Sequence, residues 1–153
     1  MTPEDKVKTW LYMQARDAGD RELFDQIVHD DIVVDDEPAG VKLVGKAQVW
    51  PGFALTAEEK SGPQSMAFGV EFLGYVGDDQ EGFARWSFRP KGSFAALWGV
   101  HDLQISEQDA LDVVIAVRVR FKDGKIHRIN EYWNPVPLLQ SFGFNVPSPA
   151  VPA

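Results

Sequence analysis

The most regular alternation of hydrophobic and polar residues lies between positions 112 and 133, close to the C-terminal end of the chain. Residues 112–121 repeat with a two-residue period, which is the pattern of a β-strand with one buried face. Asp123 and Gly124 then suit the positive φ angles of a tight hairpin turn, and a second strand is predicted over 125–133. Because an isolated hairpin is barely stable in water, these strands are expected to belong to a larger sheet.

The N-terminal segment has a helical period instead. Apolar residues at helical spacing predict a first helix over about 3–18 and a second over about 21–29. Thr2 and Asp20 precede these helices and are suited to cap their first turns. The polar run 29–31 is expected to end the second helix.

Short elements separated by turn-forming residues fill the rest of the chain. Strands are predicted over 32–36, 64–77, 82–90 and 93–103, and short helices over 45–57 and 137–142. This order predicts an α+β fold in which the N-terminal helices cover one face of a curved sheet. Such a sheet forms a cone with an open mouth, which suits a small molecule. Residues 1–145 are expected to form one domain, and 146–153 a proline-rich tail.

The composition narrows the classes of function. The 153 residues have a net charge of −8, which argues against binding nucleic acid or an anionic membrane through a basic surface. Cysteine is absent, so disulfides, thiolate catalysis and cysteine-ligated metals are excluded. No apolar run approaches the roughly 18 residues of a membrane-spanning helix, and the first residues lack a signal-peptide pattern. A cytoplasmic location is therefore expected.

Three stretches together resemble a known family. They contain Gly19-Asp20 and the acidic run ending at Asp36, then Arg85-Trp86-Ser87, and then Lys122-Asp123-Gly124 followed by Glu131-Tyr132-Trp133. In this order and spacing they resemble the SnoaL-like and steroid Δ-isomerase branch of the nuclear transport factor 2-like superfamily. The resemblance implies a cone-shaped α+β barrel with a curved mixed or antiparallel sheet around a pocket. It does not fix the reaction, because this fold hosts isomerases, aldol cyclases, epoxide hydrolases, dehydratases and non-catalytic binders.

The resemblance also implies catalytic residues. The steroid isomerases pair a carboxylate base with an oxyanion hole made of a tyrosine and a protonated aspartic acid. Tyr12 matches the tyrosine by lying eight residues before Asp20, and Asp36 matches the base by lying five residues after Asp31. Asp112 repeats the Ala-Leu-Asp letters of the oxyanion aspartate. Its spacing from the following turn differs by two residues, which would move it to the rim of the pocket.

Each of these three residues also has a structural interpretation. Tyr12 could be an edge residue of an amphipathic helix whose hydroxyl meets water. Asp36 could simply form a turn. Its acidic neighbours Asp35 and Glu37 also allow the alignment with the isomerase base to shift by one residue, although strand alternation favours Asp36. Asp112 could simply end a strand in solvent.

Glu131 is unusual because it lies between Ile129 and Trp133 on one face of a predicted strand. A carboxyl group among apolar neighbours would have a raised pKa and could act as an acid or a base near neutral pH. The resemblance supports this role, since SnoaL-type cyclases and limonene epoxide hydrolases have a carboxylate on the same strand. Alternatively, the strand faces the other way and Glu131 pairs with an arginine on a solvent or dimer face.

Aromatic residues are expected to line the pocket. The candidates for substrate contact are Trp86, Phe88, Trp98, His101 and Trp133. His101 is also a candidate proton carrier, because the cyclases tend to have a pocket histidine in this region. The histidines lack metal-ligand spacing and the glycines form no phosphate-binding loop, so neither a metal nor an organic cofactor is expected.

Two classes of function remain open. The first is a cofactor-independent isomerase or cyclase that enolises an apolar carbonyl compound such as a steroid, terpenoid or polyketide. Asp36 or Glu131 would be its base, and Tyr12, with Asp112, would hold the enolate. The second is a non-catalytic binder or dimerisation module with the same fold. An epoxide hydrolase is disfavoured because Ser87 replaces the aspartate of the required Arg-x-Asp pair. A homodimer through the sheet face is expected in each case.

Overall fold

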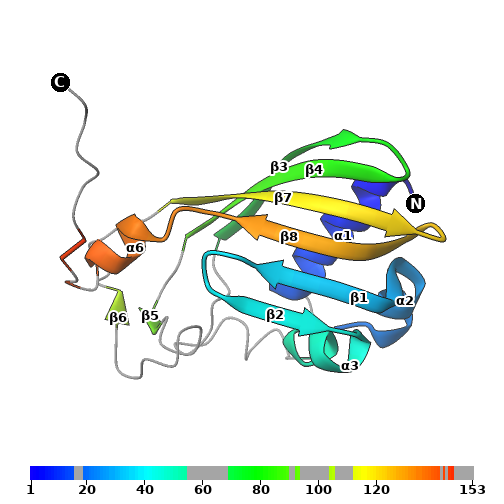
Figure 1. Cartoon of the computed structure of the whole chain (residues 1–153), viewed down its shortest axis with the longest axis horizontal. Helices are drawn as coiled ribbons and strands as arrows, with labels where there is room; N and C mark the ends of the chain where they lie inside the picture. Colours follow the sequence, from blue (N-terminus) through cyan, green and yellow to red (C-terminus); the bar gives the residue numbers. More distant parts are fainter. Residues whose placement is uncertain are drawn as a thin grey trace.

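The computed structural model describes residues 1–15, 19–54, 69–89, 92–93, 104–105 and 112–141, together with Gly143, Asn145 and Val146. Its main feature is a six-stranded curved sheet in the order β2-β1-β8-β7-β4-β3 (Figure 1). The strands are β1 Val28–Asp36, β2 Val41–Val44, β3 Gly69–Gly77, β4 Glu81–Arg89, β7 Val113–Lys122 and β8 Lys125–Tyr132. β1 and β8 run parallel, and the other neighbours are antiparallel.

The helices gather mainly on one side of this sheet. They are α1 Pro3–Ala15, α2 Arg21–Ile27, α3 Lys46–Val49, the 3₁₀ turn η1 Trp50–Gly52, and α6 Val136–Ser141. α1 crosses behind the sheet in Figure 1, while α6 follows β8 at the far end. The predicted α+β class is confirmed, with the N-terminal helices on one face of a mixed sheet. No helix in the described ranges is long and apolar enough to cross a membrane.

Both N-terminal helices begin with the capping chemistry that their sequences predict. The Thr2 hydroxyl accepts a hydrogen bond from the Asp5 backbone N–H at 3.1 Å and donates one to the Asp5 carboxylate at 2.7 Å. The Asp20 carboxylate accepts from the Leu23 backbone N–H at 3.0 Å. These bonds satisfy N–H groups that have no partner inside the helix, and so they fix where each helix starts.

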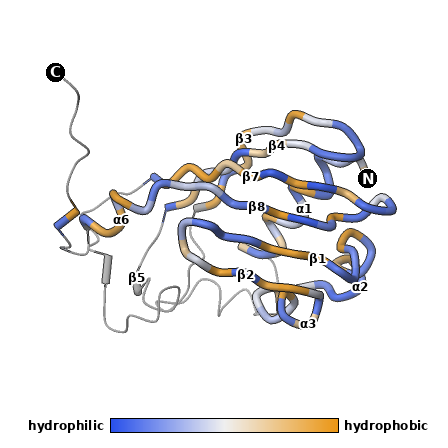
Figure 2. The backbone as a smooth tube through the Cα atoms, viewed as in Figure 1, coloured by the Kyte–Doolittle hydropathy of each residue, from blue (hydrophilic) through white to orange (hydrophobic). Residues whose placement is uncertain are grey.

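The β7–β8 hairpin also follows its sequence. Asp123 and Gly124 have φ angles of 52° and 72°, as a two-residue turn with two positive φ angles requires. The β7 residues of one parity, from Val113 to Val119, are buried, and those of the other parity are more exposed. Hydropathy alternates only in the second half of β7, from Val117 to Lys122, where the colour changes along the tube in Figure 2. One face of the sheet is therefore turned toward the helices, and we call it the inner face.

A compact aromatic group joins the helices to the sheet. The ring of Trp10 on α1 lies 4.6 Å from that of Phe53, which in turn lies 5.0 Å from Phe24 on α2. All three side chains are almost fully buried. Burial of such large apolar groups is the main favourable term that fixes α1 and α2 on the sheet.

Several predicted boundaries were wrong. α2 ends at Ile27, because Val28 is already extended and pairs with Ile126 of β8. The polar run 29–31 therefore lies inside β1 rather than between elements. β2 was not predicted, since its four residues form a strand only by pairing with β1. The predicted strand over 93–103 falls mostly outside the described residues, and a short two-stranded sheet pairs β5 (Gly92–Ser93) with β6 (Gln104–Ile105).

Candidate functional site: a carboxyl pair between two parallel strands

The parallel pairing of β1 and β8 brings two acidic residues side by side. Asp36 ends β1 and its register partner on β8 is Glu131. Neighbouring strands lie about 4.8 Å apart, so two side chains on the same face at the same register are in direct reach of each other. The two carboxyl groups are joined by a hydrogen bond.

Both carboxyl groups lie on the inner face. Ile129 and Trp133, which have the same parity as Glu131, are buried, and so is Val34, which has the parity of Asp36. Asp35 points the other way and lies 3.7 Å from the Arg128 guanidinium on the outer face. The choice of Asp36 over Asp35 therefore agrees with strand alternation.

The Asp36 carboxylate is held by two N–H donors. The indole Nε1–H of Trp133 donates to Asp36 Oδ1 at 2.9 Å, and the Ala39 backbone N–H donates to the same oxygen at 3.2 Å. Burial raises the pKa of Asp36, whereas these two hydrogen bonds act to lower it. Donors of this kind stabilise the ionised form, so Asp36 is the member of the pair suited to hold negative charge.

Glu131 is suited to hold the proton. Burial of its carboxyl group, followed by the nearby charge and hydrogen bond of Asp36, raises its pKa to about 8. The residue as a whole keeps some exposure, so its carboxyl group is shielded but not sealed from outside. Near neutral pH the pair therefore has one proton on Glu131 and one negative charge on Asp36.

The wall beside the pair is apolar and aromatic. Glu131 is opposite Val117 of β7, and Val117 is opposite Ala84 of β4. Trp86 and Phe88 follow Ala84 on the same face and are buried. Strand alternation therefore places Ala84, Trp86 and Phe88 together on the inner face. Low local polarity is the physical reason that the Glu131 carboxyl group keeps its proton.

Asp112 does not join this site. It precedes Val113, which is buried on the inner face, so alternation turns Asp112 outward. Its carboxylate lies 2.7 Å from Arg89 Nε, and both side chains are largely exposed. The Ala-Leu-Asp letters suggested an oxyanion residue, and this assignment is corrected because strand parity places the carboxylate on the opposite face.

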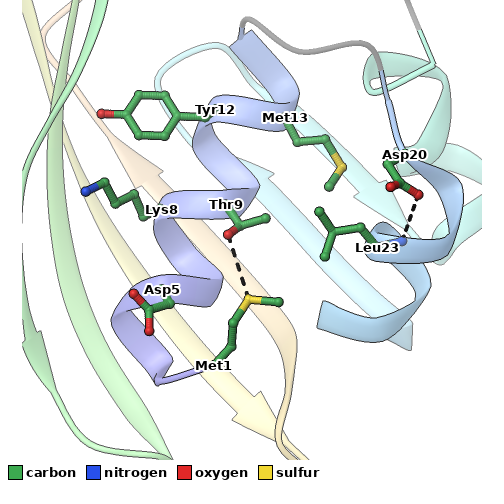
Figure 3. A pocket seen from close by; sticks show the side chains of 8 residues that line it. All are labelled: Met1, Asp5, Lys8, Thr9, Tyr12, Met13, Asp20 and Leu23. Carbon is green, nitrogen blue, oxygen red and sulfur yellow. Dashed lines mark hydrogen bonds between the residues drawn. The ribbon is translucent and has the colours of Figure 1, made fainter.

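Tyr12 lies on α1, in a groove between the two N-terminal helices. The groove has a volume of about 590 Å³ and is lined by Met1, Asp5, Lys8, Thr9, Tyr12, Met13, Asp20 and Leu23. In Figure 3 the Tyr12 ring points away from Asp20 and Leu23, while Met13 points toward Leu23. Neither member of the carboxyl pair lines this groove, so contact of Tyr12 with an enolate remains a prediction.

The other predicted contacts divide in two. Trp86, Phe88 and Trp133 are on the inner face, whereas Trp98 and His101 lie outside the described residues. Within the described ranges, no group of three or more histidine or acidic residues is arranged to bind a metal ion. Arg85 is exposed, and Ser87 has the same outward parity, so this segment does not direct a polar pair toward the inner face.

One role was missed in the sequence. Trp133 was expected only as an aromatic lining residue, but its indole N–H is a hydrogen-bond donor to Asp36. The only sequence feature that could have indicated this hydrogen bond was a tryptophan two residues after a glutamate on the same face of the strand. Its meaning depended on the β1–β8 register, which the local pattern does not contain.

Solved structures place this arrangement in a known fold class. A hypothetical protein with a ketosteroid isomerase-like fold from Catenulispora acidiphila DSM 44928, in complex with trimethylamine, is 13% identical, with 95% of this chain and 96% of that chain covered and a TM-score of 0.65. A candidate SnoaL-like polyketide cyclase from Jannaschia sp. CCS1 is 13% identical, with coverage of 95% and 98% and a TM-score of 0.61. An NTF2-like protein of unknown function from Cytophaga hutchinsonii ATCC 33406 is 9% identical, with coverage of 88% and 92% and a TM-score of 0.56. At these identities the likeness establishes the fold alone.

The sequence itself assigns the family. The chain belongs to the SnoaL-like domain family, whose model matches residues 11–129. That match includes Asp36 and the strands around the carboxyl pair as far as Ile129. No curated protein matches the chain.

Proposed function

We propose that this protein is a cofactor-independent isomerase or cyclase that moves a proton on an apolar carbonyl compound such as a steroid, terpenoid or polyketide. The observation that supports it is the hydrogen-bonded pair of Asp36 and Glu131 on an aromatic inner face. Two carboxyl groups with different affinities for a proton provide an acid and a base at the same place. A solvent-exposed carboxyl pair would not do so, because both members would be ionised at neutral pH.

In this mechanism Asp36 is the base. Its carboxylate removes a proton from the carbon next to the substrate carbonyl, and the electron pair moves to the carbonyl oxygen to give an enolate. The protonated Glu131 donates to that oxygen, which lowers the energy of the enolate. Asp36 then returns its proton to another carbon, or the enolate carbon attacks a second carbonyl in the same molecule and the alkoxide that forms takes the proton from Asp36. The first outcome is isomerisation, and the second is an aldol cyclisation.

Trp133 positions the base. Its N–H and the Ala39 backbone N–H both donate to Asp36 Oδ1, so these two bonds fix the orientation of the carboxylate. A fixed orientation of the reacting oxygen reduces the entropy that must be lost in the transition state.

The epoxide hydrolase alternative is not favoured. That chemistry needs an arginine and an aspartate two residues apart to hold and activate water, and here Ser87 replaces the aspartate. The outward parity of Arg85 and Ser87 adds a second argument against it.

The proposal is tested by solvent hydrogen exchange. A panel of cyclic β,γ-enones is incubated with the protein in D₂O, and deuterium incorporation and double-bond migration are followed by NMR. We expect both to occur with the wild-type protein and to fall to the uncatalysed rate with the Asp36→Asn, Glu131→Gln double variant, which lacks both proton-transferring groups.

Asp35→Asn with Glu71→Gln is the matched control. It makes the same two carboxyl-to-amide replacements at an outward position on β1 and an exposed position on β3, so it should keep the wild-type rate. Exchange at the uncatalysed rate with the wild-type protein, together with saturable binding of the same enones, would instead support the non-catalytic binder.

We also propose that the outer sheet face forms a homodimer. Among the described residues, the exposed apolar side chains on this face include Val76 at 79%, Phe83 at 58%, Val114 at 43% and Tyr132 at 41%. The same face contains the ion pairs of Arg118 with Glu81 and of Arg128 with Asp35. A face with apolar groups and both charge signs can pair with its own copy around a two-fold axis.

Replacing Phe83 with glutamate is expected to convert this dimer to a monomer. Each copy would bring a new charge into the apolar part of the interface, where burial of an unpaired charge is costly. Light scattering after size-exclusion chromatography gives the mass directly, with Gln14→Glu on the exposed side of α1 as the control for added charge. A wild-type protein that elutes as a monomer at high concentration would refute the assignment of this face.

A further inference from the structure

Within the described ranges, no lysine or arginine is among the main causes that shift the pKa values of the carboxyl pair. Burial and the neighbouring Asp36 are the causes of the raised Glu131 pKa, and no lysine or arginine is among them. For Asp36 the causes of its pKa shift are mainly burial and the Trp133 and Ala39 hydrogen bonds, and the charge named after them, on Asp35, is also negative and has a smaller effect. A buried negative charge without a counter-charge is unfavourable, and it is a state that a ligand can relieve.

The cations of the surrounding strands point away from the pair. On β8, Arg128 lies toward Asp35 on the outer face, and on β7, Arg118 pairs with Glu81 on the same outer face. On β2, Lys42 is the register partner of Asp35 and is exposed. The inner-face neighbours on β7 and β4 are Val117 and Ala84, which have no charge. Among the described residues, the counter-charge is therefore not supplied by the strands next to the pair.

The groups beside the pair also suit a cation. The Trp133 indole is fixed against Asp36 by its N–H edge, and Trp86 is on the same inner face. Aromatic faces next to carboxylates attract alkylated ammonium groups, because the ring face is negative and the alkyl groups favour an apolar surrounding.

We propose that the ligand of this site has a positively charged nitrogen, as a tertiary or quaternary ammonium group in an otherwise apolar frame, which lies against the Asp36–Glu131 pair. This deepens the proposed function and rests on it for the location of the ligand. It narrows the substrate class from neutral apolar carbonyl compounds to those that also contain a basic nitrogen. Anionic ligands are disfavoured for the same electrostatic reason.

Binding of such a cation is coupled to the proton of the pair. A positive charge next to Glu131 stabilises its ionised form, so the proton is released more easily in the complex than in the free protein. By linkage, the affinity for the cation rises as the pH passes upward through about 8, where the second carboxyl group ionises. A decrease of one unit in the pKa corresponds to about a tenfold gain in affinity between low and high pH.

The probes are choline and 3,3-dimethylbutan-1-ol, which have the same shape and differ in the charge of one central atom. Calorimetric titrations at pH 6 and pH 9 give both affinities, and buffers of different ionisation enthalpy give the number of protons released. We expect choline to bind more tightly than the alcohol at both pH values, with a preference about tenfold larger at pH 9 than at pH 6. The alcohol should show no such gain with pH.

Three variants test whether the preference for choline arises from the Asp36–Glu131 pair. Glu131→Gln leaves one negative charge at both pH values, so its preference for choline should not change with pH. The Asp36→Asn, Glu131→Gln double variant should bind both probes equally, while Asp35→Asn on the outer face should behave as the wild-type protein. Thermal melts monitored by circular dichroism confirm that each variant is folded.

Equal affinities of the wild-type protein for choline and the alcohol, no choline binding at millimolar concentration at pH 9, or a preference that survives in the double variant would each overturn the proposal. These outcomes can be distinguished from a failure of the proposed enzyme function. Exchange on neutral enones without cation preference would keep the proposed function and reject the cationic ligand. A preference for choline without hydrogen exchange on the enones would keep the cationic ligand and reject the proposed enzyme function.

Discussion

Replacing Asp36 with asparagine is expected to lower kcat/KM for enolisation by about 100-fold to 10,000-fold, which is the usual contribution of a positioned general base. The change keeps the shape of the side chain, and an amide oxygen can still accept the Trp133 N–H at the position of Oδ1. It removes the negative charge that takes the proton. The loss should therefore appear in kcat more than in KM, because the substrate still fits the same apolar wall.

The measurement is a steady-state assay of double-bond migration, with Asp35→Asn as the matched control. Asp35 is the adjacent residue on the same strand, but it points to the outer face and pairs with Arg128. Its replacement should change kcat/KM by less than about twofold, in line with a surface substitution. Wild-type turnover by Asp36→Asn would remove Asp36 as the base and leave Glu131 as the remaining candidate.

Much of this site could be predicted from local pattern. The two-residue alternation around Glu131 predicts that its neighbours Ile129 and Trp133 share its face, and both are buried. The same reasoning separates Asp36 from Asp35 without knowledge of the fold. Strand alternation is reliable here because one face of the sheet is covered by α1 and α2, so a shift of one residue would expose the whole apolar set.

The meeting of the two acids could not be predicted in the same way. It depends on the parallel pairing of β1 with β8, two strands that are far apart in the chain, and on the exact partner register of Asp36 with Glu131. That register includes an irregularity between Val28 and Val33, which no local pattern signals. Asp112 shows the opposite failure, because matching letters suggested a role that its outward parity excludes.

Glu131→Gln is expected to stabilise the protein at high pH, by about 3–5 kcal/mol at pH 9. Burial and Asp36 raise the pKa of the Glu131 carboxyl group to about 8 in the folded protein, from an ordinary value of 4.5 in the unfolded chain. The folded state thus holds one proton more than the unfolded state between these two pH values. Wild-type stability must therefore fall as the pH rises through this window.

The sign of the effect separates this group from an ordinary ion-paired carboxylate. Below about pH 4.5 the group is protonated in both states, and it contributes no pH dependence there. Above pH 4.5 the Glu131 carboxyl group lowers the unfolding free energy by an amount that grows with pH. This loss of stability reaches its full size above about pH 8, where the buried group must ionise. Glutamine has the shape of the protonated acid and never ionises, so the variant does not acquire the penalty.

Urea unfolding of both proteins at a series of pH values from 5 to 9 measures this difference. The two curves of unfolding free energy should lie close together near pH 5, separate steadily up to about pH 8 and keep a constant difference from there to pH 9, with the variant the more stable. Glu71→Gln, at an exposed position on β3, should remain within about 0.5 kcal/mol of the wild type throughout. Because the penalty arises only if the Glu131 carboxyl group is shielded beside Asp36, parallel curves for Glu131→Gln and the wild type would mean that the pair is solvated. The acid and base roles would then lose their physical basis together.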